Sequence, residues 1–180
     1  MIKVYSRTPL NKPVIYTIFS NPIGLTGLVA TSNGLISIIN NLKNESSIKQ
    51  HLTLLTSAEI IKQPSDFTGL VKQFSLYFKG ALKTFDFPLD LSLGTPFQQK
   101  VWKNLLTIPY GKTRSYKWLA SKIKNPQASR AVGNANGMNP LPIVIPCHRI
   151  IKGNGDLGGY TGGLNIKRFL LNLEQINAII

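Results

Sequence analysis

The first half of the chain alternates short apolar runs with turn-forming residues. Three runs rich in Val, Ile and Thr, at residues 13–19, 23–31 and 33–40, are separated by Asn, Pro and Gly. Apolar runs bounded by turn formers in this way predict β-strands joined by turns. Residues 84–91 alternate apolar and polar positions and predict one more strand.

The segment before that last strand has the period of a helix. Leu70, Phe74 and Tyr77 share one helical face, and Ser65 or Asp66 would cap the start of this helix. The glycine that follows the aromatic residues predicts its end.

From residue 95 onward the apolar positions recur at helical spacing. Thr95 is expected as the N-cap, and Pro96 as the first residue, of a core-facing helix that extends to Ile108. Residues 164–175 are amphipathic and predict a helix that closes the chain.

Two shorter helices are predicted between these, over residues 115–123 and 127–137. Ser115 would cap the first and Asn125 the second. Two short helices joined by a tight turn form a helix-turn-helix candidate. Ala and Gly dominate the second helix, which suits either close helix packing or entry into the minor groove of DNA. Arg130 is the one large side chain that projects from it. Taken alone, it is expected to contact a phosphate.

These patterns divide the chain in two and predict an α+β fold. Residues 1–94 are expected to form a small α/β scaffold domain without catalytic residues. Residues 95–180 are expected to form a helical domain that carries the chemistry.

Composition narrows the class of protein. Hydrophobic residues make up 43% of the chain and no run reaches membrane-spanning length, so a soluble, cytoplasmic protein without a signal peptide is expected. One cysteine cannot form an intramolecular disulfide, and with two histidines it cannot build a Cys-rich zinc site. We therefore expect no metal and no cofactor.

The net charge of +14 is concentrated in the second half. Residues 1–94 carry 9 basic and 5 acidic groups, whereas residues 95–180 carry 12 basic and 2 acidic groups. The near absence of carboxylates from residues 95–180 favours nucleic acid as the partner of that half.

The only cysteine, Cys147, stands in the sequence IPCHRI. A lone cysteine is most often a small buried hydrophobe, but a histidine beside it could lower the pKa of the thiol. Neighbours in an extended segment point to opposite faces, so contact between Cys147 and His148 requires a turn or a bridging water. Glu174 could orient the imidazole in a Cys–His–carboxylate relay.

Four segments resemble the methylated-DNA–protein-cysteine methyltransferases, a family that repairs 6-O-alkylguanine in DNA. IPCHRI is similar to the signature around the family's alkyl-accepting cysteine. The other three are TPFQQKVWKNLLTIPYGKTRSYKWLA, NPQASRAVGNANGMNP and GDLGGYTGGLNIKRFLLNLE. The resemblance implies a ribonuclease-H-like N-terminal domain, a winged-helix-like C-terminal domain with a helix-turn-helix, and a monomer that acts on double-stranded DNA.

The resemblance also implies a single-turnover reaction. Cys147 would take the alkyl group irreversibly from a 6-O-alkylguanine flipped out of the duplex, and also from 4-O-methylthymine. His148 would act through water as its base with Glu174 behind it, and Asn139 would brace the site.

The same resemblance assigns substrate and DNA contacts. Tyr116 would donate to the guanine ring, the carbonyl of Ile150 would accept from its amino group, the backbone N–H of Thr161 would donate to its oxygen, and Tyr160 would wall the base. For Arg130 it implies a finger that fills the space left by the flipped nucleotide, in place of a phosphate contact. Gln98, Lys117 and Asn125 fall where family members contact DNA.

Two other functions fit part of the sequence. A non-catalytic binder of alkylated DNA would keep Cys147 as a structural residue. A Cys–His hydrolase would turn over many times, but it leaves the basic half and Arg130 without a role.

Overall fold

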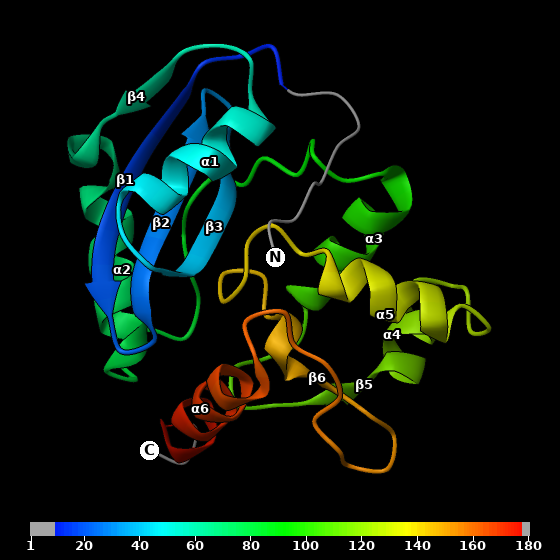
Figure 1. The fold of residues 1–180 in the computed structure, drawn as a ribbon. Helices are drawn as coiled ribbons and strands as arrows, with labels where there is room; N and C mark the ends of the chain where they lie inside the picture. The colour runs from blue at the N-terminus through cyan, green and yellow to red at the C-terminus, as the bar shows by residue number, and fades with distance from the viewer. Residues whose placement is uncertain (1–9, 178–180) are drawn as a thin grey trace. The chain divides into compact units, whose positions relative to one another are not determined.

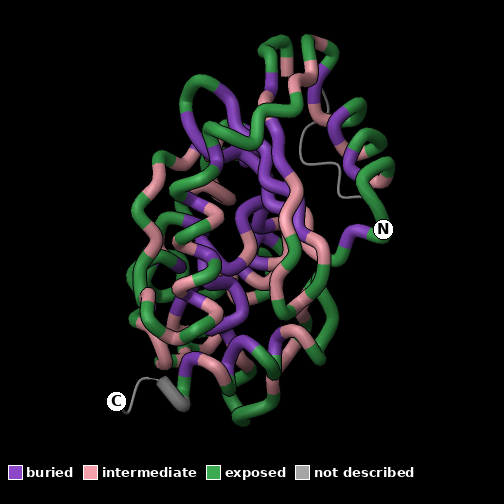
Figure 2. Tube along the Cα trace, turned by 90° about the vertical axis from the view of Figure 1, so that its left-hand side faces the viewer, coloured by how far each residue is buried: buried purple, intermediate pink, exposed green. Residues whose placement is uncertain are grey.

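The computed structural model describes residues 10–177, and Figure 1 shows its helices and strands. The chain divides into two compact units, Met1–Leu93 and Gly94–Ile180. Six α-helices and a four-stranded sheet occur in the described part, so the predicted α+β class is confirmed. Buried positions recur along the elements and give way to exposed ones at the turns (Figure 2).

The sheet of the first unit is an antiparallel meander with one added strand. Strands β1 (Val14–Asn21), β2 (Gly24–Thr31) and β3 (Gly34–Leu42) follow one another, and β4 (Ile60–Lys62) pairs with β1 in parallel, giving the order β3-β2-β1-β4. Two-residue turns join the meander strands, which is the connection that antiparallel neighbours favour. The three predicted strands of the meander are therefore confirmed.

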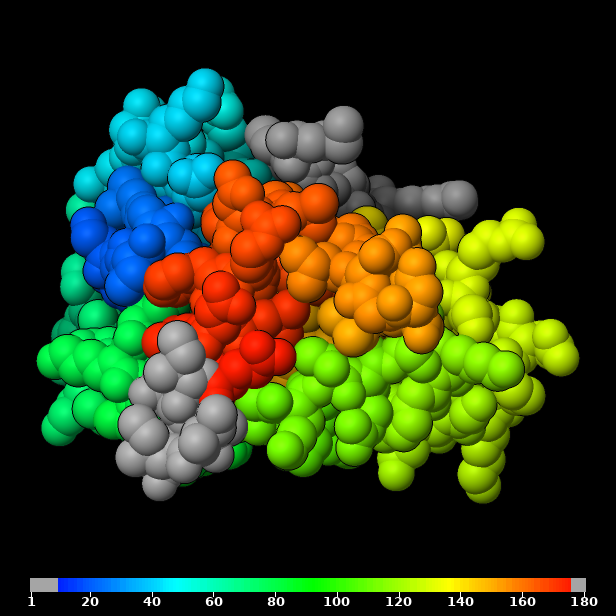
Figure 3. Space-filling model, turned by 90° about the horizontal axis from the view of Figure 1, so that it is seen from below, coloured from blue at the N-terminus to red at the C-terminus, as the bar shows by residue number. Residues whose placement is uncertain are grey.

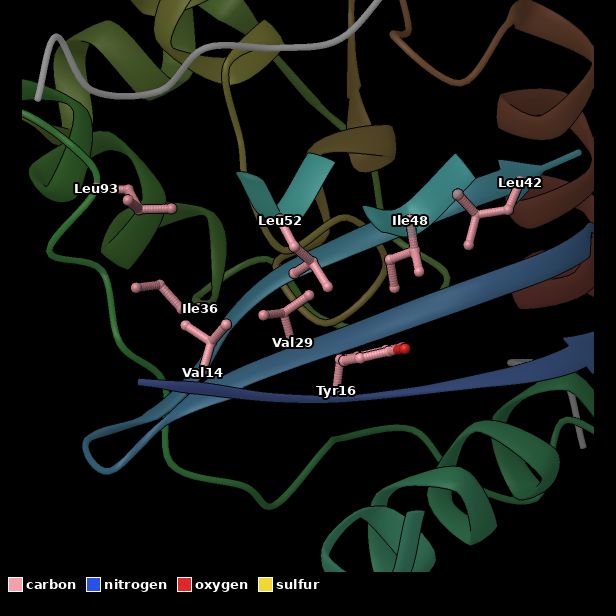
Figure 4. Close-up of a cluster of buried hydrophobic side chains, with 8 residues drawn as sticks. All are labelled: Val14, Tyr16, Val29, Ile36, Leu42, Ile48, Leu52 and Leu93. Carbon is pink, nitrogen blue, oxygen red and sulfur yellow. The ribbon is translucent and has the colours of Figure 1, made fainter. Parts of the chain in front are cut away.

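Helices cover both faces of this sheet. Ile48 and Leu52 of α1 (Ser46–Leu55) pack on the face that carries Val14 and Tyr16, as Figure 4 shows. On β1 the odd-numbered residues point the opposite way, and Phe19 there contacts a ring of α2 (Thr68–Phe78). That ring belongs to Phe74, and its centroid lies 5.3 Å from the Phe19 ring.

Two predictions for the first unit were wrong, and one helix was missed. Residues 84–91 form no strand: Leu89 makes one isolated bridge to Leu35, and Pro88 has no N–H with which to extend a ladder. The backbone also passes very close, since a Cβ on Gly34 would lie 2.3 Å from the Pro88 oxygen. The helix at α1 was not predicted. A 3-10 turn, η1 (Pro64–Phe67), precedes α2, which has no side-chain cap from either predicted residue.

The second unit is mainly helical. Its elements are α3 (Pro96–Leu105), β5 (Arg114–Ser115), α4 (Tyr116–Lys122), α5 (Ser129–Gly137), η2 (Cys147–Arg149), β6 (Ile150–Ile151) and α6 (Leu164–Asn177). Helices α3, α4 and α5 pack against one another, and β5 pairs with β6 in parallel.

The helix starts in the second unit follow the sequence in three cases out of four. Helix α6 begins at Leu164, as predicted. Thr95 caps α3 in a full capping box with Gln98, and the Ser115 hydroxyl caps α4, as predicted. The start of α5 was predicted too early: Ala128 is its N-cap, and Asn125 lies in the preceding turn, where its carbonyl accepts from the Ala128 N–H. Helix α3 also ends before the predicted Ile108.

Within residues 10–177, no helix combines the length and apolar character needed to cross a bilayer.

Candidate active site

A strained turn, and not a strand, leads into the cysteine. Ile143 has a φ of 79°, a left-handed conformation that is costly for a β-branched residue, by about 1–3 kcal/mol. Asn139 supports the turn, since its Nδ2 donates to the Ile145 carbonyl at 2.8 Å and its Oδ1 accepts from the Leu141 N–H at 3.0 Å. Burial of this apolar segment offsets the strain, because Leu141, Ile143 and Ile145 are all buried.

Cys147 begins the 3-10 turn η2, which also contains His148 and Arg149. Of the geometries considered from the sequence, the structure therefore has the turn, and the cysteine and histidine follow each other around it. Both are buried, with 5% of Cys147 and none of His148 exposed. Both residues belong to the second unit.

The imidazole of His148 is oriented by Glu174 on α6. Nε2 of His148 lies 2.8 Å from Oε1 of Glu174. Since a carboxylate only accepts, Nε2 must carry the proton, and Nδ1 of the neutral ring then keeps its lone pair. Among the described residues Nδ1 has no hydrogen-bond partner, although it is buried. The arrangement thus provides a buried proton acceptor beside Cys147.

Glu174 is held as a carboxylate by several donors. Burial alone would raise its pKa, but hydrogen bonds and charge from His148 and Arg149 outweigh burial and hold the pKa well below its ordinary value. Arg149 donates from Nε to Oε2 at 2.8 Å and from Nη2 to Oε1 at 3.0 Å, and the Gly111 N–H donates to Oε2 at 3.1 Å. Burial lowers the pKa of His148 although Glu174 opposes it, so the ring stays neutral near pH 7.

Two tyrosines lie near the cysteine. Burial, and after it the negative charge of an ionised Cys147, raises the pKa of Tyr116. The same two causes, joined by Glu174, raise the pKa of Tyr160 well above its ordinary value. Both phenols therefore stay protonated and can donate hydrogen bonds. Within the described residues the buried Tyr160 Oη has no partner.

The predicted substrate residues border a glycine-rich loop, residues 152–163. Figure 3 shows this segment (orange) at the surface beside α6 (red). The side chain of Thr161 donates from Oγ1 to the Gly137 carbonyl at 2.9 Å, which ties the loop to the end of α5. The carbonyl of Ile150, expected to accept from a base, accepts here from Nζ of Lys167.

The predicted DNA contacts lie on the helices before the cysteine. Lys117 on α4, Asn125 in the turn after it and Arg130 on α5 are exposed. Gln98 on α3 is half-buried, and its Oε1 accepts from the Thr95 N–H in the capping box.

Three residues of the site were missed by sequence reasoning. They are Arg149, Lys167 and Asn136, whose Nδ2 donates to the Cys147 carbonyl at 3.3 Å. A signal existed for Arg149, because it lies within the IPCHRI motif and a buried carboxylate, one of only two in residues 95–180, needs a cation as its partner. Nothing in the periodicity marked the other two as buried.

The buried cysteine, histidine and glutamate on a helical unit define a cysteine-dependent enzyme. Comparison with known proteins identifies its family. A family described as "6-O-methylguanine DNA methyltransferase, DNA binding domain" matches residues 96–176, which contain Cys147, His148 and Glu174. The matched residues all lie in the second unit. Because curated relatives are 43–50% identical over 71–90% of this chain, the chain belongs to the methylated-DNA–protein-cysteine methyltransferase family and is an enzyme of that family.

Relatives come from bacteria and archaea. The chain is 50% identical over 140 residues to the methyltransferase of Mycobacterium tuberculosis H37Rv, covering 71% of this chain and 84% of the relative. It is 45% identical over 159 residues to that of Methanosarcina acetivorans, covering 88% and 97%. The crystal structure of Mycobacterium tuberculosis OGT in complex with DNA matches with a TM-score of 0.79 at 44% identity, covering 91% of this chain and 94% of the other.

Proposed function

We propose that this protein repairs DNA by transferring the alkyl group of 6-O-alkylguanine to Cys147, once per molecule. The observation that carries the proposal is the unpartnered Nδ1 of His148, held beside the cysteine by the bond from Nε2 to Glu174. A water that bridges Nδ1 and the thiol would carry the proton from sulfur to the ring.

The transfer follows from that arrangement. The thiolate sulfur attacks the alkyl carbon, a C–S bond forms, and the bond from that carbon to the guanine oxygen breaks with its electron pair leaving on the base. Tyr116 donates a proton or hydrogen bond to the ring, and the backbone N–H of Thr161 donates to the departing oxygen. These donors stabilise charge that develops only in the transition state. The product is a thioether, which has no easy reversal. The reaction therefore consumes the protein.

Access to the lesion requires the nucleotide to leave the duplex. The small residues of α5 would enter the minor groove, Arg130 would occupy the vacated space, and Lys117 and Asn125 would hold the backbone. Flipping costs a few kcal/mol of unstacking, and electrostatic contacts by the basic unit offset that cost. We propose that this unit has a winged-helix-like fold. For the first unit we propose a ribonuclease-H-like fold that acts as a scaffold.

The base would be recognised by groups around η2. The carbonyls of Cys147 and Ile150 would accept from the amino group of guanine, Asn139 would keep the turn rigid, and Tyr160 would pack on the alkylated base. The same acceptor thiol would also take a methyl group from 4-O-methylthymine. A monomer suffices, since all these residues belong to one unit.

The test is stoichiometric transfer. The protein is incubated with a duplex that contains labelled 6-O-methylguanine, and label on the peptide carrying Cys147 is measured by mass spectrometry. We expect one label per molecule, and none in Cys147→Ala, which should still bind DNA. Label in that variant at the wild-type level would overturn the nucleophile assignment. Repeated turnover would instead favour a hydrolase, and binding without transfer a non-catalytic binder.

A further inference from the structure

A buried lysine stands beside the proposed site without a carboxylate partner in the described part of the chain. Lys167 on α6 has none of its surface exposed. Its Nζ donates to the carbonyls of Ile150, Leu157 and Gly159. An ammonium has three N–H donors, so three carbonyls satisfy it completely.

Stability alone does not account for a buried lysine without a carboxylate partner. Removing an ammonium from water costs several kcal/mol, and carbonyl dipoles compensate only part of that cost. An apolar side chain of similar volume would fill the same space without this penalty. A function other than packing is therefore needed to account for the charge.

The three carbonyls come from two segments that flank the cysteine. Ile150 belongs to β6, directly after the 3-10 turn of Cys147, and pairs with Arg114 of β5. Leu157 and Gly159 belong to the glycine-rich loop, which has no helix or strand of its own. Among residues 10–177, Lys167 is the one side chain that bonds both the middle of this loop and β6.

Besides Lys167, the Thr161 hydroxyl ties the end of the loop to the Gly137 carbonyl, and bonds between Lys152 and Asp156 or Gly155 close its first turn, but none of these joins the middle of the loop to β6. Gly155 and Gly158 have positive φ values of 91° and 67°, and glycine loses more conformational freedom on ordering than other residues do. An exposed ion pair between Lys152 and Asp156 closes its first turn, and such pairs contribute at most about 1 kcal/mol. Gly159 directly precedes Tyr160, so a bond to its carbonyl also places that tyrosine.

We propose that Lys167 is a positioning residue, whose ammonium holds the glycine-rich loop against β6 and so keeps Tyr160 and Thr161 in place beside Cys147. The proposal rests on the proposed function, since Thr161 and Tyr160 act there on the alkylated base. It adds a residue that does not touch the reacting atoms and acts through the loop.

The experiment compares Lys167→Met with Lys152→Met in the full chain. The first removes the buried ammonium and the second an exposed lysine of the same loop. Hydrogen exchange of residues 152–163 and the second-order rate of transfer from free 6-O-benzylguanine are measured, together with alkylation of Cys147 by iodoacetamide as a function of pH. We expect Lys167→Met to lose at least about tenfold in transfer and to exchange faster in the loop, while Lys152→Met stays within about twofold of wild type.

The iodoacetamide reaction separates positioning from two other roles. A positioning residue should leave the pH profile of this small reagent unchanged, because the reagent needs no ordered loop. A profile shifted to higher pH would mean that Lys167 acts by stabilising the thiolate. Such a shift would overturn the proposal, as would transfer within twofold of wild type. No transfer by the wild-type protein would refute the proposed function instead.

A second pair of variants covers the case in which the first does not fold. Lys167→Ala is assayed with and without added ethylammonium, and partial recovery of transfer by the amine supports positioning. If Lys167→Ala also fails to fold, Lys167→Arg is assayed, which keeps the charge but replaces three diverging donors with a planar fork. A tenfold loss supports the proposal, and wild-type transfer in Lys167→Arg overturns it.

Discussion

His148 and Glu174 form a buried hydrogen bond in which Nε2 of the ring lies 2.8 Å from Oε1 of the carboxylate. Twenty-five residues separate them in sequence, and α6 brings the carboxylate back to the turn that carries the cysteine. Because the bond occupies Nε2, the other ring nitrogen is the one available as a base. The direction of proton movement at the site is thus set by a residue on the last helix.

Glu174→Gln is expected to reduce transfer from 6-O-benzylguanine by about 10²–10⁴-fold, since an amide allows the wrong imidazole tautomer and does not stabilise an imidazolium. It should also destabilise the protein by about 3–5 kcal/mol, because Arg149 keeps a buried charge without its partner. Single-turnover kinetics and denaturant unfolding measure the two effects. Asp156→Asn is the matched control, an exposed carboxylate of the same unit with little expected effect. Wild-type rates in Glu174→Gln would refute the relay.

The rate of transfer should fall at acidic pH as His148 becomes protonated. Burial lowers the pKa of His148 below its ordinary 6.5, so its acid limb should lie below pH 6.5. The unfolded chain then binds more protons at this site than the folded chain, and folding stability is lost as pH falls below 6.5. His148→Gln, which can still donate to Glu174, should lack both the acid limb and this loss. Rate and unfolding free energy are compared between pH 4.5 and 8. A wild-type acid limb above pH 7 would contradict the assignment.

Arg149 contributes mainly to the stability of the site. Arg149→Met removes two bonds to Glu174 and one to the Ile108 carbonyl, which lies 2.6 Å from Nη1. The expected cost is about 3–5 kcal/mol of unfolding free energy, since the carboxylate stays buried with one charged partner fewer. Arg114→Met is the control, because Arg114 is exposed and stacks only on the Trp118 ring. Equal effects of the two changes would show that the buried pair is not a stabilising feature.

The sequence predicted the parts of the fold that depend on local patterns. Thr95 and Ser115 could be identified as caps because a side-chain oxygen directly before a helical pattern accepts a hydrogen bond from a free N–H of the first turn. The strands of the meander could be predicted because turn-forming residues bound each of their apolar runs. Leu89 was misassigned because alternation cannot reveal that Pro88 leaves only one bridge possible.

The site was predictable only where chemistry and sequence position agree. Cys147, His148 and Glu174 could be named because one thiol, one adjacent imidazole and one of two carboxylates leave few combinations. Lys167 could not, since a lysine on an amphipathic helix is usually solvated, and its burial depends on a loop that folds over it. Its partners are backbone carbonyls, which every residue carries, so the residue types do not reveal them.

Arg130 should matter for transfer from DNA and not from a free base. Arg130→Ala is expected to slow transfer from a duplex containing 6-O-methylguanine by at least about tenfold, since the flipped state loses the side chain that occupies the vacated space. Transfer from free 6-O-benzylguanine should not change. The control is Arg168→Ala, which removes the same charge from an exposed position on α6. If both variants slow transfer from DNA equally, the effect of Arg130 is that of a phosphate contact. In that case the slope of the logarithm of DNA affinity against the logarithm of salt concentration should be reduced by about 0.9.

Lys167 should also give the protein a distinctive dependence of stability on pH. Burial lowers its pKa to about 8, although the negative charge of an ionised Cys147 opposes the shift. Between pH 8 and the ordinary lysine value near 10.5, the unfolded chain binds more protons at this site than the folded chain. Wild-type stability should therefore rise with pH relative to Lys167→Met, by at most about 1.4 kcal/mol per pH unit. Over the same range the neutral amine keeps only two donors for three carbonyls, so the loop should lose protection against exchange, corrected for the intrinsic pH dependence of the exchange rate, while wild-type stability rises relative to Lys167→Met. Denaturant unfolding and hydrogen exchange at pH 7, 8 and 9.5 measure these opposite trends, and a loop that tightens with pH would contradict the assignment of Lys167.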